Sequence, residues 1–184
     1  LTAFGLSAQD SGHFADVLAQ ASSNANTNVG LMGATFKYVA PVAGAMGYSI
    51  EDTAVAIGLM ANAGIKGEQA GTALRAMFTR LVKPPKDAAD ALDALGISAA
   101  NSDGSMRPLS DLLGELREKL SGLTDEEKAS YAAGIAGQEA MSGLLAIVGA
   151  SEADFEKLTA AVNGADGAAL RMAETMQDNL QGQI

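Results

Sequence analysis

Apolar residues recur three and four positions apart along almost the whole sequence, and this spacing limits the possible folds more than any other feature. Residues at those intervals share one face of an α-helix, so the pattern predicts a succession of short amphipathic helices. The stripes run through Phe14, Val17, Leu18 and Ala21; Ala70, Leu74, Met77, Phe78, Leu81 and Val82; Leu109, Leu112, Leu113, Leu116 and Leu120; Met141, Leu144, Leu145 and Val148; Phe155, Leu158 and Val162; and Ala169, Met172, Ala173, Met176 and Leu180. We expect an all-α fold, an irregular bundle of about eight to ten helices with Leu74, Met77, Phe78 and Leu81 in its core.

Capping residues mark the ends of several expected helices. Three hydroxyl residues are followed three positions later by a carboxylate, a pattern typical of a helix N-terminus. These pairs are Ser49 with Asp52, Thr124 with Glu127, and Ser151 with Asp154. Four glycines lie where a helix should stop, and we expect the left-handed conformation that ends many helices. They are Gly64, Gly96, Gly122 and Gly164.

Two places depart from the helical pattern. Pro41 falls inside the apolar run from Met32 to Met46, so either a helix kinks there or a new helix begins at Pro41. The stretch from Ile97 to Pro108 contains an Asp-Gly pair flanked by apolar residues, which is a hairpin signal. One short β-hairpin near residues 97–108 is therefore compatible with the otherwise helical expectation.

The apolar content is built from small side chains. The chain has 37 Ala and 21 Gly among its 184 residues, but only 5 Phe, 3 Tyr and no Trp. Small residues let helices pack closely in a soluble bundle, and they also favour helix association within membranes. The uncharged runs are short or interrupted by polar residues, which favours the soluble bundle over a membrane-spanning protein.

Charge is distributed unevenly around the segment Lys83-Pro84-Pro85-Lys86. Residues 1–86 include 5 acidic and 6 basic residues, whereas residues 87–184 include 17 acidic and 6 basic residues. We therefore predict two helical subdomains, near-neutral residues 1–83 and acidic residues 84–184. The formal net charge of −10 disfavours a nucleic-acid-binding domain, which normally has a basic surface. Because the sequence starts with Leu and ends in a polar helical run, we expect a fragment of a longer protein.

Few residues have the chemistry of an active site. The chain has no Cys, which excludes thiolate sites. It has one His, His13, so a His-rich metal site or a Ser-His-Asp triad has few of the residues it would need. His13 has no carboxylate or hydroxyl partner at a fixed spacing and is a weak catalytic candidate. Gly64 to Gly67 is too short for a phosphate-binding loop.

The charged clusters have structural interpretations. Asp87, Asp90 and Asp93 share a helix face opposite an apolar one, and we predict that this face is solvated rather than metal-binding. Asp125-Glu126-Glu127 falls in a first helical turn, where the helix dipole favours anions. The basic patch of Lys83, Lys86, Arg75 and Arg80 is expected to contact the acidic C-terminal half rather than phosphate. We predict no catalytic, cofactor-binding or metal-binding residues and no enzymatic activity.

One long stretch resembles the core region of phage tail tape measure proteins. The resemblance runs from Asn28 to Ala54 and from Leu59 to Leu81, and the part from Asn62 to Arg75 is specific to that family. Shorter matching pieces follow in the family's order. They are Ala94 to Ile97, Gly104 to Leu109, Gly137 to Ala140, and Leu144 to Ala146.

The resemblance implies a structural role in a tailed phage or prophage. Proteins of this family are long and mostly helical, set tail length during assembly, and leave ahead of the DNA. Implied partners are the tail tube, tail assembly chaperones, other copies of the chain in the tube, and the host envelope at infection, without specific nucleic-acid binding. The implied location is the tail lumen of the virion after synthesis in the bacterial cytoplasm.

The main alternative is a membrane-active helical protein such as a toxin or pore-former. It is motivated by the Gly- and Ala-rich amphipathic helices, which are typical of such proteins as well.

Overall fold

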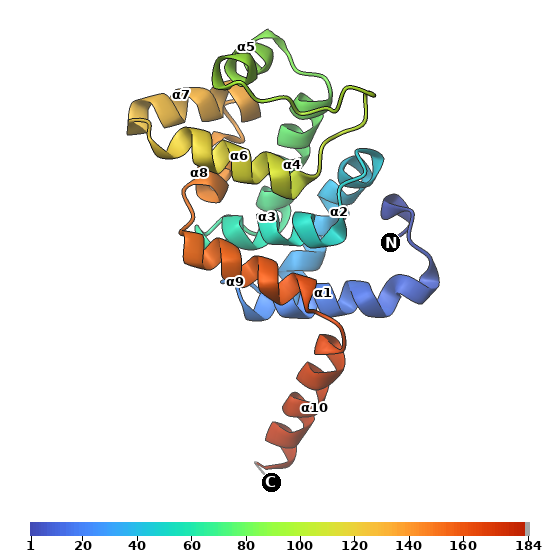
Figure 1. Ribbon diagram of the computed structural model, residues 1–184. Helices are drawn as coiled ribbons and strands as arrows, with labels where there is room; N and C mark the ends of the chain where they lie inside the picture. The colour runs from blue at the N-terminus through green and yellow to red at the C-terminus, as the bar shows by residue number, and fades with distance from the viewer. Residues whose placement is uncertain (183–184) are drawn as a thin grey trace.

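A computed structural model describes residues 1–182, which form ten α-helices after two short 3₁₀ turns, Thr2–Phe4 and Ala8–Asp10 (Figure 1). The helices are α1 (Ser11–Ser23), α2 (Val29–Ala45), α3 (Ile50–Asn62), α4 (Gly67–Val82), α5 (Lys86–Leu95), α6 (Leu109–Ser121), α7 (Asp125–Ala136), α8 (Met141–Val148), α9 (Glu152–Asn163) and α10 (Ala168–Gln181). The expected all-α bundle of short helices is confirmed.

Helix α3 lies at the centre of the bundle (Figure 1). It packs against α1, α8 and α9, and more lightly against α2, α4 and α6. The most extensive helix pair is α2 with α4, while α7 packs between α5 and α8. Helix α10 projects from the lower edge of the bundle in Figure 1, where it packs against α1.

The hydrophobic core is one continuous cluster that draws residues from helices α1 to α9. Its largest fully buried side chains include Phe78, Met32, Ile57 and Leu109. Leu74, Met77, Phe78 and Leu81, the four residues predicted to be in the core, are all buried there. The division into residues 1–83 and 84–184 stays a prediction, since both parts contribute to this cluster and neither is seen alone.

Close helix contacts depend on glycine. At Gly71 of α4, a Cβ atom would lie 2.7 Å from the Cβ of Tyr38 and 2.9 Å from the carbonyl oxygen of Thr35. The buried hydroxyl of Thr35 donates to the carbonyl oxygen of Gly67 at 2.8 Å, so a hydrogen bond also joins α2 to α4. At Gly143 of α8, a Cβ atom would lie 2.8 Å from the terminal carbon of Met60. The small residues of the sequence are therefore used for close packing.

The predicted N-terminal caps are confirmed. Ser49, Thr124 and Ser151 each accept a hydrogen bond from the backbone N–H three residues on, at the starts of α3, α7 and α9. Among the glycines, the left-handed prediction is right for Gly64 (φ 87°) and Gly96 (φ 70°).

The same prediction is wrong for Gly122 (φ −90°) and Gly164 (φ −103°). Each of them directly follows a helix, but the chain leaves that helix through an ordinary negative-φ residue.

The two irregular segments are resolved as follows. Helix α2 runs through Pro41, whose ring is on the exposed side, so a new helix does not begin there. The segment 97–108 turns back on itself, with one antiparallel bridge between Ala100 and Met106 and a hydrogen bond of 2.7 Å from Asn101 N–H to the Ser105 carbonyl oxygen. No strand forms in residues 1–182. Nor does any helix there combine the length and the apolar character needed to cross a membrane.

Candidate functional site

The aspartate row on α5 is exposed, as predicted. Asp87, Asp90 and Asp93 all lie on the surface of the helix. Asp87 contacts Arg80 at 2.6 Å, and Asp90 contacts Lys86 at 2.5 Å. In residues 1–182, no group of three or more His, Asp or Glu side chains is arranged to hold a metal ion.

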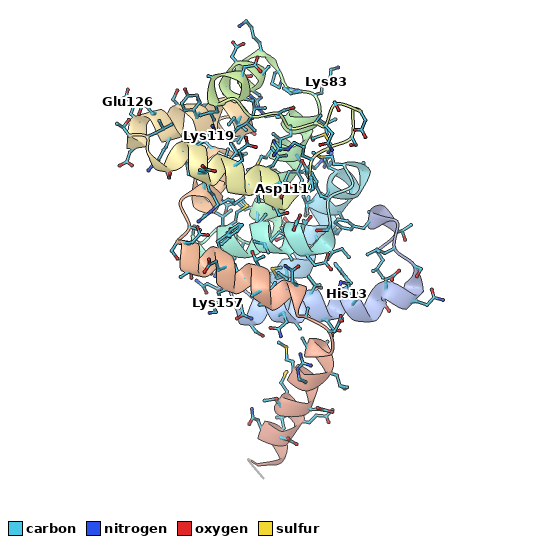
Figure 2. All side chains as sticks on the ribbon, viewed as in Figure 1. His13, Lys83, Asp111, Lys119, Glu126 and Lys157 are labelled. Atoms are coloured by element: carbon cyan, nitrogen blue, oxygen red, sulfur yellow. The ribbon has the colours of Figure 1, made fainter. Side chains whose placement is uncertain are left out.

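Arg80 connects the basic patch to the acidic half of the chain. Its guanidinium donates to the carbonyl oxygens of Gly134 and Ile135, at 2.8 and 3.1 Å, in the last turn of α7. It also pairs with Asp87, whose pKa this hydrogen bond lowers. A cation there satisfies helix C-terminal carbonyls that have no partner within the helix. The expectation that the patch contacts the acidic half is confirmed for Arg80. In Figure 2, Lys83 lies near the top of the molecule, and His13 lies in the lower half, above α10.

Other helix ends are capped by side chains from distant helices. Arg117 of α6 donates to the carbonyl oxygen of Ile147 in α8 at 2.9 Å and lies over the ring of Phe155 at 4.7 Å. The carboxylate of Asp52, at the start of α3, accepts from the N–H of Ser110 in α6 at 3.1 Å. Sequence reasoning missed these caps, because residues so far apart in the chain show no local signal.

The contacts of His13 are a second set that sequence reasoning missed. Its ring nitrogens face two carboxylates: Nε2 contacts Glu51 of α3, and Nδ1 lies 3.1 Å from Asp166 in the loop after α9. No carboxylate partner of His13 was visible at a fixed sequence spacing, because folding brings Glu51 and Asp166 to it from distant parts of the chain. The hydrogen bonds to Glu51 and then Asp166 raise the pKa of His13. Figure 2 shows His13 on α1, near the junction of α9 and α10.

An apolar groove of about 650 Å³ lies at the other end of the bundle. It is formed by α4, α5, the C-terminal end of α2 and the loop 97–106, with Met46, Val82, Leu92 and Met106 among its walls. Val82 is 53% exposed, so the last residue of the stripe predicted for α4 lies outside the core. Asp93 is the one ionisable side chain among the described residues that line the groove. This lining therefore offers mainly apolar contact.

The sequence matches the family of phage-related minor tail proteins over residues 1–137. The chain belongs to this family. The match confirms the resemblance drawn from Asn28 to Leu81, which lies within the matched residues.

Two curated phage proteins align with almost the whole chain. The "Tape measure protein" of Pneumococcus phage Dp-1 is 46% identical over 184 residues, which is 100% of this chain and 16% of the relative. The "Probable tape measure protein" of Escherichia phage P2 is 36% identical over 184 residues, covering 98% of this chain and 23% of the relative. The chain thus spans less than a quarter of either relative. No solved structure matches it.

Proposed function

We propose that this chain is part of a phage tape measure protein, which sets the length of the tail during assembly. The observation that carries the proposal is the alignment of two tape-measure relatives, from phages of different hosts, along essentially the whole chain. Its role is structural rather than enzymatic. This fits a surface on which the charged residues described above serve as helix caps and surface ion pairs.

The partners of such a protein are the tail tube, the tail assembly chaperones and other copies of the chain, inside the lumen of the tail. The host envelope becomes a partner at infection. The acidic balance of the chain is compatible with a place near DNA without binding to it, since phosphate repels a surface of the same sign.

The folded bundle supplies little length per residue. An α-helix rises about 1.5 Å per residue, but the longest helix here, α2, has 17 residues and folds back on α4. A ruler built from such bundles alone would be short for its mass. We therefore infer that most of the measured length comes from helical regions of the longer protein, and that residues 1–182 form a compact unit within it.

An in-frame deletion in the full-length gene tests the ruler. Removing about 60 residues from a repetitive helical region outside this bundle should shorten the tail by about 90 Å, at 1.5 Å per residue. Electron micrographs of the mutant phage give the tail length directly. As a matched control, Asp87→Asn, Asp90→Asn and Asp93→Asn should leave tail length unchanged, because these side chains are exposed.

Two outcomes would count against the proposal. Tails of unchanged length after the deletion would reject the ruler. Tails of normal length that fail to deliver DNA would favour a membrane-active role instead.

A further inference from the structure

The joint between α9 and α10 is made of two glycines around a short loop. Helix α9 ends at Asn163 and α10 begins at Ala168, with Gly164, Ala165, Asp166 and Gly167 between them. Gly167 has a φ of 79°, a conformation that favours glycine. The small side chain of Ala165 is buried, so the loop is anchored at one point while its neighbours stay accessible.

The start of α10 is held by α1. The carboxylate of Asp16 accepts hydrogen bonds from the N–H groups of Gly167 and Ala169, at 2.7 and 2.9 Å. The carboxylate of Asp16 therefore caps the N-terminus of α10, although it lies 151 residues before Gly167 in the sequence. The bonds from Ala169 and then Gly167 lower the pKa of Asp16. This cap therefore persists at every pH above the acid range.

Beyond its first turn, α10 packs against α1 on one side and leaves most of its described side chains exposed. Helix α1 is its principal neighbour, and a groove of about 280 Å³ remains between them, beside Gln20, Ser23 and Met172. Leu170 and Met176 are 66% and 60% exposed. These exposed side chains bury little apolar area, so the polar contacts at the joint add to the packing against α1 in setting the direction of the helix.

The protonation state of His13 decides whether its ring can hydrogen-bond to both Glu51 and Asp166. Both ring nitrogens face carboxylate oxygens, which accept hydrogen bonds and cannot donate them when ionised. Only the imidazolium has an N–H on each nitrogen, so only the charged form can donate to Glu51 and Asp166 together. The neutral ring must direct a lone pair at one carboxylate. The contact with Asp166 is then lost, because that side chain is 93% exposed whereas Glu51 is half-buried.

We propose that His13 is a protonation-dependent clamp that fixes α10 against the bundle by bridging α3 to the α9–α10 joint. In its charged form the bridge is closed and α10 keeps one direction. In its neutral form the joint loses its bridge to α3 and keeps the Asp16 cap and the buried Ala165, so the direction of α10 is less narrowly fixed. The proposal concerns residues 1–182 and does not depend on the ruler function.

The direction of the pH dependence follows from the groups around the ring. Asp10 lies at the end of the 3₁₀ turn just before α1, and Asp16 lies on α1 itself. The other charged groups around the ring are Glu51 on α3, Asp166 in the joint, and Arg171 of α10, which lies near Asp16. Carboxyl groups generally ionise well below neutral pH, so His13 is the group here that changes charge between about pH 5.5 and 8.5. Because its pKa is raised by folding, the clamp is fully present below the ordinary value of 6.5 and is lost as the pH rises through the higher folded value.

The lone histidine makes the first test direct. In an NMR titration, one imidazole resonance reports the pKa of His13 without assignment. We expect a pKa above that of the chain unfolded in urea, and a lower pKa in Asp166→Ala, which removes one partner from an exposed loop. Asp93→Ala, far from the joint, is the matched control and should leave the titration unchanged. The proposal would be overturned if the pKa of His13 equalled that of the unfolded chain, or if it did not change in Asp166→Ala.

The second test follows α10 itself. Since the chain has no Cys, spin labels can be placed on Cys substitutions at the exposed Lys157 of α9 and Asp178 of α10, and at Lys157 and Lys119 as a control within the bundle. We expect the first pair to give a narrow distance distribution at pH 5.5 and a broad one at pH 8.5. The control pair should give a narrow distance distribution at both pH values. His13→Ala and Asp166→Ala should each give the broad distribution at pH 5.5.

The outcomes separate the clamp from other causes. An unchanged distribution between the two pH values in the unsubstituted chain would overturn the proposal. So would a pH response that survives in Asp166→Ala, a substitution that leaves the core untouched. A broader distance distribution for the control pair in His13→Ala would show that this variant is generally unfolded. The Asp166→Ala variant alone would then test whether the clamp exists.

Discussion

Helices α3 and α10 have almost the same length, 13 and 14 residues, and opposite surroundings. Ten residues of α3 are buried, including Ile57, Leu59 and Met60 on different sides of the helix. Among residues 168–180 of α10, only the first, Ala168, is buried, and large apolar side chains such as Met176 are exposed. The two helices are at the centre and the lower edge of Figure 1.

The contrast shows what determines burial in this fold. The stripe of α10 is the more regular amphipathic pattern, since its charged residues lie opposite its apolar ones. Helix α3 has little polar face, because α1, α8 and α9 surround it. An apolar stripe predicts which side of a helix is apolar, but the number of neighbouring helices decides whether that side is buried.

The largest expected effect is in the closed bundle around α3. Phe78 of α4 is fully buried, with its ring against that of Tyr48 at 5.1 Å in an edge-to-face arrangement. We expect Phe78→Ala to lower the free energy of unfolding by about 3–5 kcal/mol, through lost burial and a new cavity. Urea unfolding followed by far-UV circular dichroism measures it. A loss below about 0.5 kcal/mol would show that the interior of the bundle is not closed around this ring.

A smaller effect tests the close contact of α2 with α4. In Gly71→Ala the added methyl group would meet Tyr38 and the backbone of Thr35, at distances too short for carbon atoms. We expect a loss of about 1–3 kcal/mol, the usual range for overpacking. Gly33→Ala on α2 is the matched control. Its Cβ meets nothing within 4 Å, so it should raise stability by about 0.5–1 kcal/mol through helix propensity. Effects of equal sign at both sites would contradict the predicted contact.

Much of the fold could be predicted because it depends on local patterns. All five apolar residues of the Leu109 stripe are buried, and the Ser49, Thr124 and Ser151 caps lie where hydroxyl and carboxylate spacing placed them. Both signals act within one or two helical turns. The conformation of Gly122 could not be predicted in this way, because a helix can stop before glycine without a left-handed residue.

The contacts at the helix ends could not be predicted, because they join distant parts of the chain. Asp16 caps α10, Arg80 caps α7 and Arg117 caps α8, each from another helix. Short helices have many unpaired terminal groups for their length, so such caps matter more here than in a bundle of long helices. The partners of His13 were hidden for the same reason: Glu51 is 38 positions away and Asp166 is 153.

The smallest expected effect concerns α10. Leu180 is 64% exposed, so Leu180→Ala should change the free energy of unfolding by less than about 0.5 kcal/mol. Leu59→Ala is the same substitution in α3, where the side chain is 1% exposed, and should cost about 2–5 kcal/mol. Urea unfolding of both variants, monitored by circular dichroism, compares the two helices with the chemical change held constant.

A loss above about 1 kcal/mol for Leu180→Ala would contradict the exposure of this side chain in solution. Repeating the measurement at a tenfold higher protein concentration would then show what covers it. Stability that rises with concentration would indicate a second copy of the chain, because binding between folded copies stabilises them by mass action. Stability independent of concentration would indicate instead that α10 folds back onto its own bundle. Only a small, concentration-independent effect leaves the contrast between α3 and α10 as the structure has it.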